Sequence, residues 1–322
     1  MKKILITGGA GFIGSHLAEE LLQKGNDIVI LDDLSTGSLE NIYHLKNEPK
    51  FRFVLGSVMD EAKLDELVRD CDEAYHLAAV VGVKLVFENP VQTIVVNVKG
   101  TENALNSCLR FAKKILVVST SEVYGKDVDP KLKKFHEDLD LSLGPSLRWS
   151  YACSKALDEY LALSYHKKMG LPVVVVRIFN TVGPRQSGAY GMVIPRLVGQ
   201  ALSGQPITVY GDGRQVRSFS WIKDTIKAMT GLMAKQEAIG GVFNIGSEEA
   251  ITINQLAQKI KQKTRSASPI VHIPYTQAYG KDFEDIRFRV PDTAKLKSFI
   301  PFKPTLNLDQ ILDQIVAFAK GK

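Results

Sequence analysis

The sequence predicts an α/β protein, in which a Rossmann-type, doubly wound parallel sheet is joined to a smaller, irregular α+β C-terminal domain. Three observations lead to this prediction. Short apolar segments alternate with amphipathic segments of helical length through the first half of the 322-residue chain. A glycine-rich turn follows the first apolar segment. After about residue 177, turns and prolines become frequent and the alternation stops.

The alternation gives the elements in order. We expect strands at residues 3–7, 27–31, 51–55, 73–77, 114–118 and 172–177, and helices at 12–24, 60–69, 91–112 and 151–169. The apolar segment 242–245 predicts one further strand, which returns to the sheet. Ligands of such sheets bind beyond the carboxyl ends of the strands, so the loops that follow these strands are the expected site.

The glycines of the first loop predict a dinucleotide site. Gly8, Gly11 and Gly14 lie between the first strand and the first helix, and Phe12 and Ile13 open that helix. Gly8 suits a tight turn, Gly11 lets a pyrophosphate approach the backbone, and Gly14 lets the helix pack against the strand. The N-terminus of the helix offers N–H groups and a partial positive charge to the phosphates.

The acidic residue at the end of the second strand indicates which dinucleotide binds. Asp32 follows Gly14 by eighteen residues. A carboxylate at this place accepts hydrogen bonds from the adenosine ribose and repels a 2′-phosphate. We therefore expect NAD rather than NADP.

Composition excludes several classes of protein. Apolar residues make up 45% of the chain and charged residues 24%, which is ordinary for a soluble globular protein. The net charge is +6, but the lysines are spread along the chain, so we expect a solvated surface and no nucleic-acid partner. No segment is long enough to span a membrane. Cys71, Cys108 and Cys153 have no metal-ligand spacing, which predicts reduced thiols, a cytoplasmic protein and no metal.

A second group of residues predicts the chemistry. Tyr151 and Lys155 lie four apart, on one face of the expected helix. An ammonium group beside a phenol favours the phenolate, so we expect the Tyr151 pKa to be lowered and the residue to act as a base. The Thr120 hydroxyl is expected to share the substrate oxygen. With NAD as hydride acceptor, this set suits the oxidation of an alcohol.

Several of these motifs together resemble the extended short-chain dehydrogenase/reductase family, in its NAD-dependent nucleotide-sugar epimerase/dehydratase branch. The resemblance runs nearly end to end. Besides Thr7–Gly14, it rests on His76–Ala79, Asn97, Ser119–Gly125, Tyr151 with Lys155, Arg177–Asn180, Gly183–Arg185, Tyr210–Gly213, Arg217 and Arg289–Asp292. The resemblance implies that Tyr151 deprotonates a sugar hydroxyl, usually at C4, and that Lys155 holds the nicotinamide ribose.

The resemblance also assigns the remaining site residues. Ser57, Val58, Leu77, Ala78 and Ala79 would contact the cofactor, and Asn97 would support the active-site helix. An acidic residue often follows the glycine of the third strand in this family, whereas here Ser57 follows Gly56. Substrate contacts would come from Asn180, Arg185, Val193, Arg217 and Arg289, with segment 190–198 against the nucleotide base. Arginine suits this role because its planar fork matches phosphate oxygens.

Domain organisation and assembly follow from the same resemblance. Residues 1–176 with about 221–248 would form the NAD-binding domain, and residues 177–220 with about 249–322 the nucleotide-sugar-binding domain. The nucleotide is expected to be a uridine diphosphate. Helices 91–112 and 151–169 resemble the pair that forms a four-helix dimer interface, so a homodimer is expected.

The second step of the reaction stays open at this point. Residues 190–196 and 206–211 resemble sugar-nucleotide 4-epimerases, which favours a 4-epimerase of a UDP-hexose. Glu122 favours other outcomes, because the Thr120–Glu122 segment resembles 4,6-dehydratases and glucuronate decarboxylases. In a dehydratase, Glu122 would be the base that removes the C5 proton. A catalytically silent NAD-binding sensor is the remote alternative, and the intact set of Thr120, Tyr151 and Lys155 argues against it.

Overall fold

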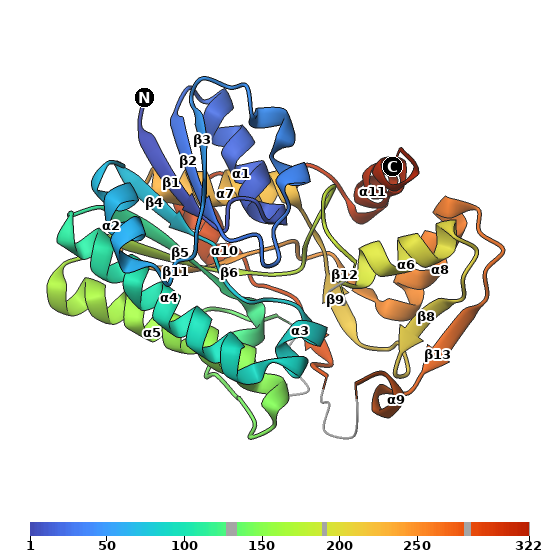
Figure 1. Cartoon of the computed structure of the whole chain (residues 1–322). Helices are drawn as coiled ribbons and strands as arrows, with labels where there is room; N and C mark the ends of the chain where they lie inside the picture. The colour runs from blue at the N-terminus through green and yellow to red at the C-terminus, as the bar shows by residue number, and fades with distance from the viewer. Residues whose placement is uncertain (127–133, 189–191, 280–284, 322) are drawn as a thin grey trace.

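The structure is a computed structural model that describes residues 1–126, 134–188, 192–279 and 285–321 (Figure 1). Its centre is a seven-stranded parallel sheet in the order β11-β6-β5-β4-β1-β2-β3. The strands are β1 (Lys3–Thr7), β2 (Asp27–Asp32), β3 (Phe51–Leu55), β4 (Glu73–His76), β5 (Lys114–Thr120), β6 (Val173–Ile178) and β11 (Val242–Ile245). The direction of strand order reverses between β1 and β4, and this is where such sheets bind ligands.

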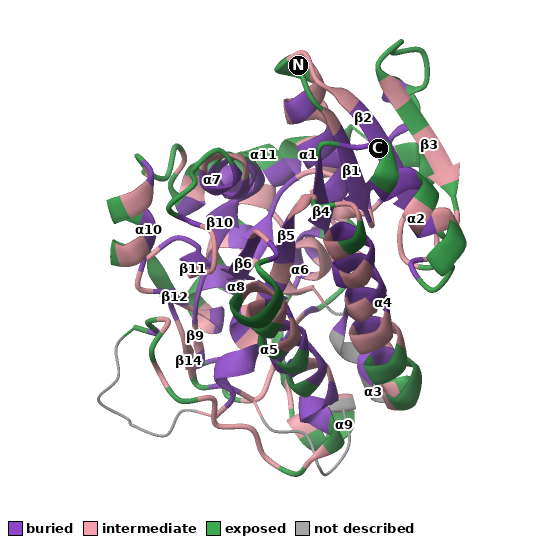
Figure 2. Cartoon of the chain, turned by 90° about the vertical axis from the view of Figure 1, so that its left-hand side faces the viewer, coloured by how far each residue is buried: buried purple, intermediate pink, exposed green. Residues whose placement is uncertain are grey.

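Helices cover both faces of this sheet. Ile4 and Ile6 of β1 face one side, which carries α1 (Phe12–Gln23) and α7 (Ile222–Met233). Leu5 faces the other side, which carries α2 (Glu61–Arg69), α4 (Pro90–Arg110) and α5 (Ser150–Met169). Figure 2 shows the buried strands between these helical layers. The strands are therefore apolar on both faces, as a doubly covered parallel sheet requires.

The C-terminal part adds three small sheets and several helices. The sheets pair β7 (Thr181–Val182) with β10 (Ser220–Trp221), β8 (Ile207–Tyr210) with β13 (Ile270–Ile273), and β9 (Val216–Ser218) with β12 (Ala250–Thr252) and β14 (Phe288–Arg289). The helices are α6 (Val193–Leu202), α8 (Ile253–Thr264), α9 (Tyr275–Tyr279), α10 (Ala294–Phe299) and α11 (Leu308–Lys320). Short elements elsewhere are α3 (Val83–Glu88) and the 3-10 turns η1 (Leu39–Asn41), η2 (Tyr43–Leu45), η3 (Ser121–Tyr124) and η4 (Leu147–Trp149).

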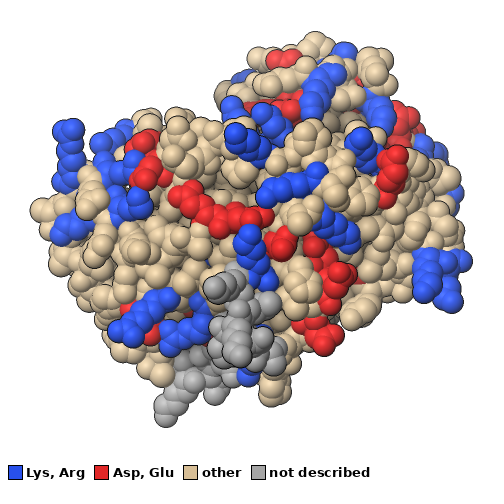
Figure 3. Space-filling model, turned by 180° about the vertical axis from the view of Figure 1, so that it is seen from behind, with Lys and Arg blue, Asp and Glu red and all other residues tan. Residues whose placement is uncertain are grey.

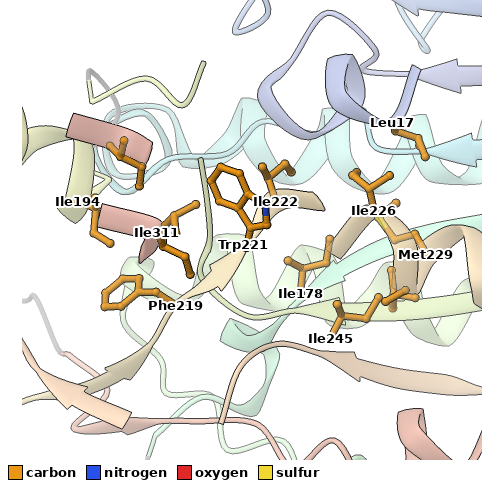
Figure 4. Close-up of a cluster of buried hydrophobic side chains, with 14 of the residues drawn as sticks. Leu17, Ile178, Ile194, Phe219, Trp221, Ile222, Ile226, Met229, Ile245 and Ile311 are labelled. Atoms are coloured by element: carbon orange, nitrogen blue, oxygen red, sulfur yellow. The ribbon is translucent and has the colours of Figure 1, made fainter. Parts of the chain in front are cut away.

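One hydrophobic core joins the sheet to the C-terminal part. Figure 4 shows Trp221 and Ile222 at its centre, and the cluster extends to Leu17 of α1 and to Ile194 and Ile311 of α6 and α11. All these side chains are buried. Because the cluster is continuous, the loops after the strands and the C-terminal elements are held in place together.

The structure confirms the predicted fold class. Each expected strand and helix of the first half is present within two residues of its predicted ends. Segment 242–245 forms β11, which pairs with β6 at the sheet edge. Helices α6, α8 and α11 lie in the C-terminal domain, which was predicted to be an irregular α+β domain without assigned helices, and α7 adds a covering helix to the sheet.

The distribution of charged side chains on the surface agrees with the solvated surface that the spread-out lysines predicted. On the face shown in Figure 3, basic and acidic side chains are interspersed. Among the described helices, none combines the length and apolar character needed to cross a lipid bilayer.

A buried ion pair fixes α5 to the sheet. Arg177 at the end of β6 donates three hydrogen bonds of 2.7 to 3.1 Å to the carboxylate of Glu159 on α5. Both residues are buried, and the Ser119 hydroxyl also donates to Glu159. The pair joins α5, which carries Tyr151 and Lys155, to the two strands beside it.

We predict that Glu159→Gln lowers the free energy of unfolding by about 3 kcal/mol, because it leaves a buried guanidinium without its charge partner. Denaturant unfolding followed by circular dichroism measures the change. Glu102→Gln is the matched control: its Lys99 pair is exposed, so the expected loss stays below about 1 kcal/mol. Equal losses in the two variants would contradict the assignment.

Candidate active site

A cavity of about 750 Å³ opens at the carboxyl ends of the strands. This volume is typical of a site for a small organic molecule. The loops after β1, β2, β3, β4 and β5 form one part of its wall, and residues of β9, α6 and β14 form the other. All the sequence-predicted site residues except Asn97 line it.

The glycine loop is shaped by close backbone approach. Gly8 has a φ of 71°, and a Cβ there would lie 2.7 Å from the backbone nitrogen of Ala78. A Cβ on Gly14 would overlap the carbonyl oxygen of Gly8. Gly11 is the N-cap of α1 and offers no side chain to the first N–H groups of the helix, which face the cavity. This arrangement fits a pyrophosphate.

Asp32 lies where a ribose-binding carboxylate is expected. Its two carboxylate oxygens accept hydrogen bonds from the backbone N–H groups of Ala10 (2.9 Å) and Leu34 (2.8 Å), so its orientation is fixed. Burial raises its pKa, while these two backbone bonds oppose the rise. The rest of the predicted cofactor wall lines the same part of the cavity: Phe12, Ile13, Ser57, Val58, Leu77, Ala78 and Ala79.

Asn97 lies behind the cavity wall, where it connects two parts of the site. Its side-chain oxygen accepts from the N–H of Val80 at 2.7 Å, and its amide donates to the Ser154 hydroxyl at 3.0 Å. Asn97 is buried on α4, so it ties the loop after β4 to the helix that carries Tyr151 and Lys155.

Tyr151 and Thr120 lie side by side in the cavity wall, and their hydroxyl groups are hydrogen-bonded. The expectation of a lowered Tyr151 pKa is wrong for the chain by itself. Burial raises this pKa, and the negative charges of Glu122 and Asp158 raise it further. The phenolate is therefore disfavoured by its surroundings.

The reason lies in the partner of Lys155. Its ammonium group donates a 2.6 Å hydrogen bond to Asp158, one helical turn further along α5, and both side chains are buried. A carboxylate so close neutralises most of the field that the ammonium would exert on Tyr151. Thr101 is also hydrogen-bonded to Asp158, and His76 lies within 3.1 Å of Thr101.

Glu122 is held between two arginines. One carboxylate oxygen accepts from Arg148 at 2.7 Å and the other from Arg289 at 2.8 Å. Burial would raise the Glu122 pKa, but the two positive charges outweigh it and lower the pKa to about 2. Glu122 is thus an ionised, weakly basic group, and we call it with Arg148 and Arg289 the Glu122 cluster.

The predicted substrate residues fall into two groups. Arg289 also donates to the side-chain oxygen of Asn180 at 2.6 Å, and Arg217 forms a buried 2.7 Å ion pair with Asp285. These three and Val193 line the cavity near the Glu122 cluster. Arg185 instead directs its guanidinium at Glu19 of α1, away from the other three. Tyr190 and Gly191, which were also expected here, lie outside the described residues.

Comparison with known proteins places this site in a family. The sequence model of the GDP-mannose 4,6 dehydratase family matches residues 5–315. The chain belongs to this family. The family is NAD-dependent, and its members and structural neighbours act on nucleotide sugars. No cluster of metal-ligating side chains occurs in the described part of the chain.

Individual relatives are similar over almost the whole chain. UDP-N-acetyl-α-D-glucosaminuronate decarboxylase of Bacillus cytotoxicus is 42% identical over 318 residues, covering 98% of this chain and 97% of the relative. UDP-glucuronic acid decarboxylase 1 of Arabidopsis thaliana is 34% identical, with 98% and 69% covered. The solved structure of UDP-glucuronic acid 4-epimerase from Bacillus cereus, in complex with UDP-glucuronic acid and NAD, has a TM-score of 0.89, 28% identity and 99% coverage of both chains.

Sequence reasoning missed two residues of this family site. Arg148 precedes Tyr151 by three residues and Asp158 follows Lys155 by three. A helical spacing of three places side chains on one face, so Asp158 was within reach of the argument applied to Tyr151 and Lys155. Arg148 was not, because it lies in η4, before the expected helix begins.

We predict that Asp158→Asn lowers the Tyr151 pKa, because it removes one negative charge and frees the Lys155 ammonium. NMR titration of protein labelled at the tyrosine Cζ carbons measures this, with Tyr151→Phe identifying the resonance. Asp309→Asn, which alters an exposed carboxylate on α11, is the control and leaves the Tyr151 titration unchanged. A Tyr151 titration identical in Asp158→Asn and the unaltered protein would refute the role given to Asp158.

Proposed function

We propose that this protein is an NAD-dependent decarboxylase of a UDP-linked uronic acid. The observation that carries the proposal is the Glu122 cluster, in which Arg148 and Arg289 hold one carboxylate at the sugar end of the cavity. The two arginines and Glu122 together keep one positive charge, which favours a sugar with an anionic group. The two curated relatives described above are named as decarboxylases of UDP-linked uronic acids.

The cofactor would be held by the residues that fit it. Gly8, Gly11 and Gly14 leave room for the pyrophosphate beside the N-terminus of α1, and Asp32 would accept hydrogen bonds from the adenosine ribose. When bound, NAD supplies a hydride acceptor with a positively charged ring. That charge is needed here, because the surroundings of Tyr151 otherwise disfavour the phenolate.

The first step would be oxidation of the sugar at C4. Tyr151 accepts the proton of the C4 hydroxyl, and Thr120 donates a hydrogen bond to the same oxygen. Lys155 lies on the same helix face as Tyr151 and is positioned by its hydrogen bond to Asp158. The product of this step is a 4-ketone.

The state of Glu122 argues against dehydration as the second step. Removal of a C5 proton needs a base, but Glu122 has a pKa of about 2 and both its oxygens accept hydrogen bonds from arginine. A 4-keto uronic acid needs no such base. The C5–C6 bond breaks, CO₂ leaves, and the electron pair passes to the C4 carbonyl as an enolate. C5 then takes a proton from water, and the hydride returns to C4 as Tyr151 gives its proton back to the oxygen.

A 4-epimerase is the second candidate. The solved UDP-glucuronic acid 4-epimerase has the same fold over 99% of the chain, and the sequence of residues 190–196 and 206–211 resembles sugar-nucleotide 4-epimerases. It shares the oxidation at C4 and differs only in what the ketone does next.

We assign the nucleotide to the C-terminal part of the chain. Residues 1–176 with about 221–248 would hold NAD, and residues 177–220 with about 249–322 would hold the UDP-sugar. Arg217, Arg289 and Asn180 are the proposed contacts to the diphosphate and ribose, with Val193 against the base. The Gln215 side-chain oxygen and the Arg289 Nε belong to residues that line the cavity, and among the described residues these two buried atoms have no hydrogen-bond partner, which supports a polar ligand there. Cytoplasmic location stays a prediction.

Incubation with a panel of UDP-sugars tests the proposed reaction. With UDP-glucuronate or UDP-N-acetylglucosaminuronate we expect loss of the mass of CO₂ and, in D₂O, one deuterium at C5, read by mass spectrometry and NMR. UDP-glucose should be left unchanged. An isomer of unchanged mass from the uronic acids would establish the 4-epimerase, and loss of water would establish a dehydratase.

A variant of the Glu122 cluster sharpens this test. Arg148→Met should lower kcat/KM for the uronic acid at least about tenfold, since removing one partner of a buried charged contact costs ~2–5 kcal/mol. Its NAD content should not change. Arg287→Met is the matched control, because Arg287 is exposed and pairs with Asp212 outside the cluster. Full uronic-acid turnover by Arg148→Met would contradict the role given to the cluster.

We also propose a homodimer through α4 and α5. These helices pack side by side, and Figure 2 shows exposed residues along their outer faces. Val91 and Val95 on α4 and Leu157 and Tyr160 on α5 are 45–74% exposed, and exposed apolar side chains on neighbouring helices are typical of an interface. The helical spacing of both pairs suits packing against a second copy as a four-helix bundle.

We predict that Tyr160→Glu converts a dimer into a monomer, because it places a charge in this apolar face. Sedimentation velocity measures the mass in solution. Val271→Glu, at an exposed apolar position on β13, is the control and should leave the dimer intact. If the unaltered protein is monomeric in solution, the proposed homodimer is wrong.

A further inference from the structure

Arg185 lies in a position that its predicted role does not explain. It follows β7, in the part of the chain assigned to the nucleotide sugar, yet its guanidinium contacts α1. One terminal nitrogen donates to Glu19 Oε1 at 3.1 Å and the other to Glu19 Oε2 at 2.8 Å. A third hydrogen bond of 2.9 Å reaches the carbonyl oxygen of Asn41. The guanidinium therefore joins three segments that are far apart in sequence.

The segments joined by Arg185 surround the proposed adenosine end of the cavity. Glu19 is on α1, whose first turn carries the glycine loop. Asn41 follows the loop after Asp32, and its side-chain amide donates to the carbonyl oxygen of Ala10 at 2.9 Å. The N–H of Ala10 in turn donates to Asp32. Arg185, Asn41 and Asp32 all line the cavity.

The backbone at Arg185 supports a role beyond packing. Its φ of 70° lies in the left-handed region, which costs a residue with a side chain about 1 kcal/mol or more. A conformation of this kind persists only where its contacts hold it. The side chain is 13% exposed and that of Glu19 27%, so the bidentate pair is largely shielded from water. Burial opposes ionisation of Glu19, but His16 and Arg185 together lower its pKa to about 2.

We propose that Arg185 is a positioning residue that retains NAD, by tying the loop after β7 to α1 and to the Asp32–Asn41 loop. NAD dissociates only after the hydrogen bonds from Arg185 to Glu19 and Asn41 break. Direct contact of the Arg185 guanidinium with the substrate, as the sequence predicted, would require it to give up both oxygens of Glu19. The proposed positioning role of Arg185 therefore replaces its predicted role in substrate binding.

Retention matters because the reaction is redox-neutral. The hydride taken from C4 must return to the same sugar, so loss of the reduced cofactor with a keto sugar still bound would stop the enzyme. The inference uses the NAD dependence of the proposed function and does not depend on the second step. A protein that proves to be a 4-epimerase would leave it intact.

The test measures NAD release directly. Protein loaded with radiolabelled NAD is mixed with excess unlabelled NAD, and the retained label is followed by rapid filtration. We expect Arg185→Gly and Glu19→Gln each to release NAD about tenfold faster, as for loss of a shielded charged contact. Glycine accepts the left-handed backbone, so Arg185→Gly removes the guanidinium and also relieves the strain that goes with it.

A double variant and a control decide the outcome. If the two residues act through one contact, Arg185→Gly with Glu19→Gln releases NAD no faster than either single variant. Arg110→Gln breaks an ion pair to Asp65 between α4 and α2, outside the cavity, and should leave release unchanged. Release at the unaltered rate in both single variants, or additive effects in the double variant, would overturn the proposal. So would weaker UDP binding by Arg185→Gly with unchanged NAD release.

Discussion

The ionised carboxylate of Glu122 is the constraint on which the site depends. It brings Arg148, from the turn before α5, and Arg289, from the end of β14, to one point beside Tyr151. Without a negative charge between them, two buried guanidinium groups would repel each other. The same charge makes Tyr151 harder to ionise. One carboxylate thus holds two guanidinium groups in this part of the cavity wall and raises the pKa of the neighbouring tyrosine.

Lys155 shows the same principle one helical turn away. Its pairing with Asp158 orients the ammonium but reduces its influence on Tyr151. The pKa of Tyr151 therefore depends on the charges of Glu122 and Arg289 and on those of Lys155 and Asp158, which lie on α5 itself. In a site of this kind, a bound ligand with a positive charge lowers the pKa of the tyrosine. Without that ligand the tyrosine stays protonated and is less reactive.

The sequence was sufficient to predict the parts of the fold that depend on local patterns, such as hydrophobic periodicity and the spacing of neighbouring residues. The strands of the first half obey periodicity and were predicted correctly. The glycine loop lies between β1 and α1 and Asp32 ends β2, as their spacing predicted, while their contact with the cofactor stays a prediction. The partners of the charged side chains were not, because Arg289 reaches Glu122 across 167 residues and Arg185 reaches Glu19 across 166. Such contacts depend on how distant segments pack. The predicted pKa direction of Tyr151 was wrong for two reasons. The spacing argument considered Lys155 without Asp158, which is three residues further along the same helix. It also could not show that Glu122, from another part of the chain, lies near Tyr151.

The position of β11 at the edge of the sheet has a consequence for synthesis. Strand β6 contains Val173 to Val176, all fully buried in the finished sheet, and one of its sides is covered only by β11. On the ribosome, β6 emerges more than sixty residues before its partner. During that interval it is an unpaired, strongly apolar edge, the kind of surface on which nascent chains associate with one another. A chain terminated between the two strands would therefore expose this edge and aggregate. Folding without aggregation depends on the four residues of β11, which are synthesised late.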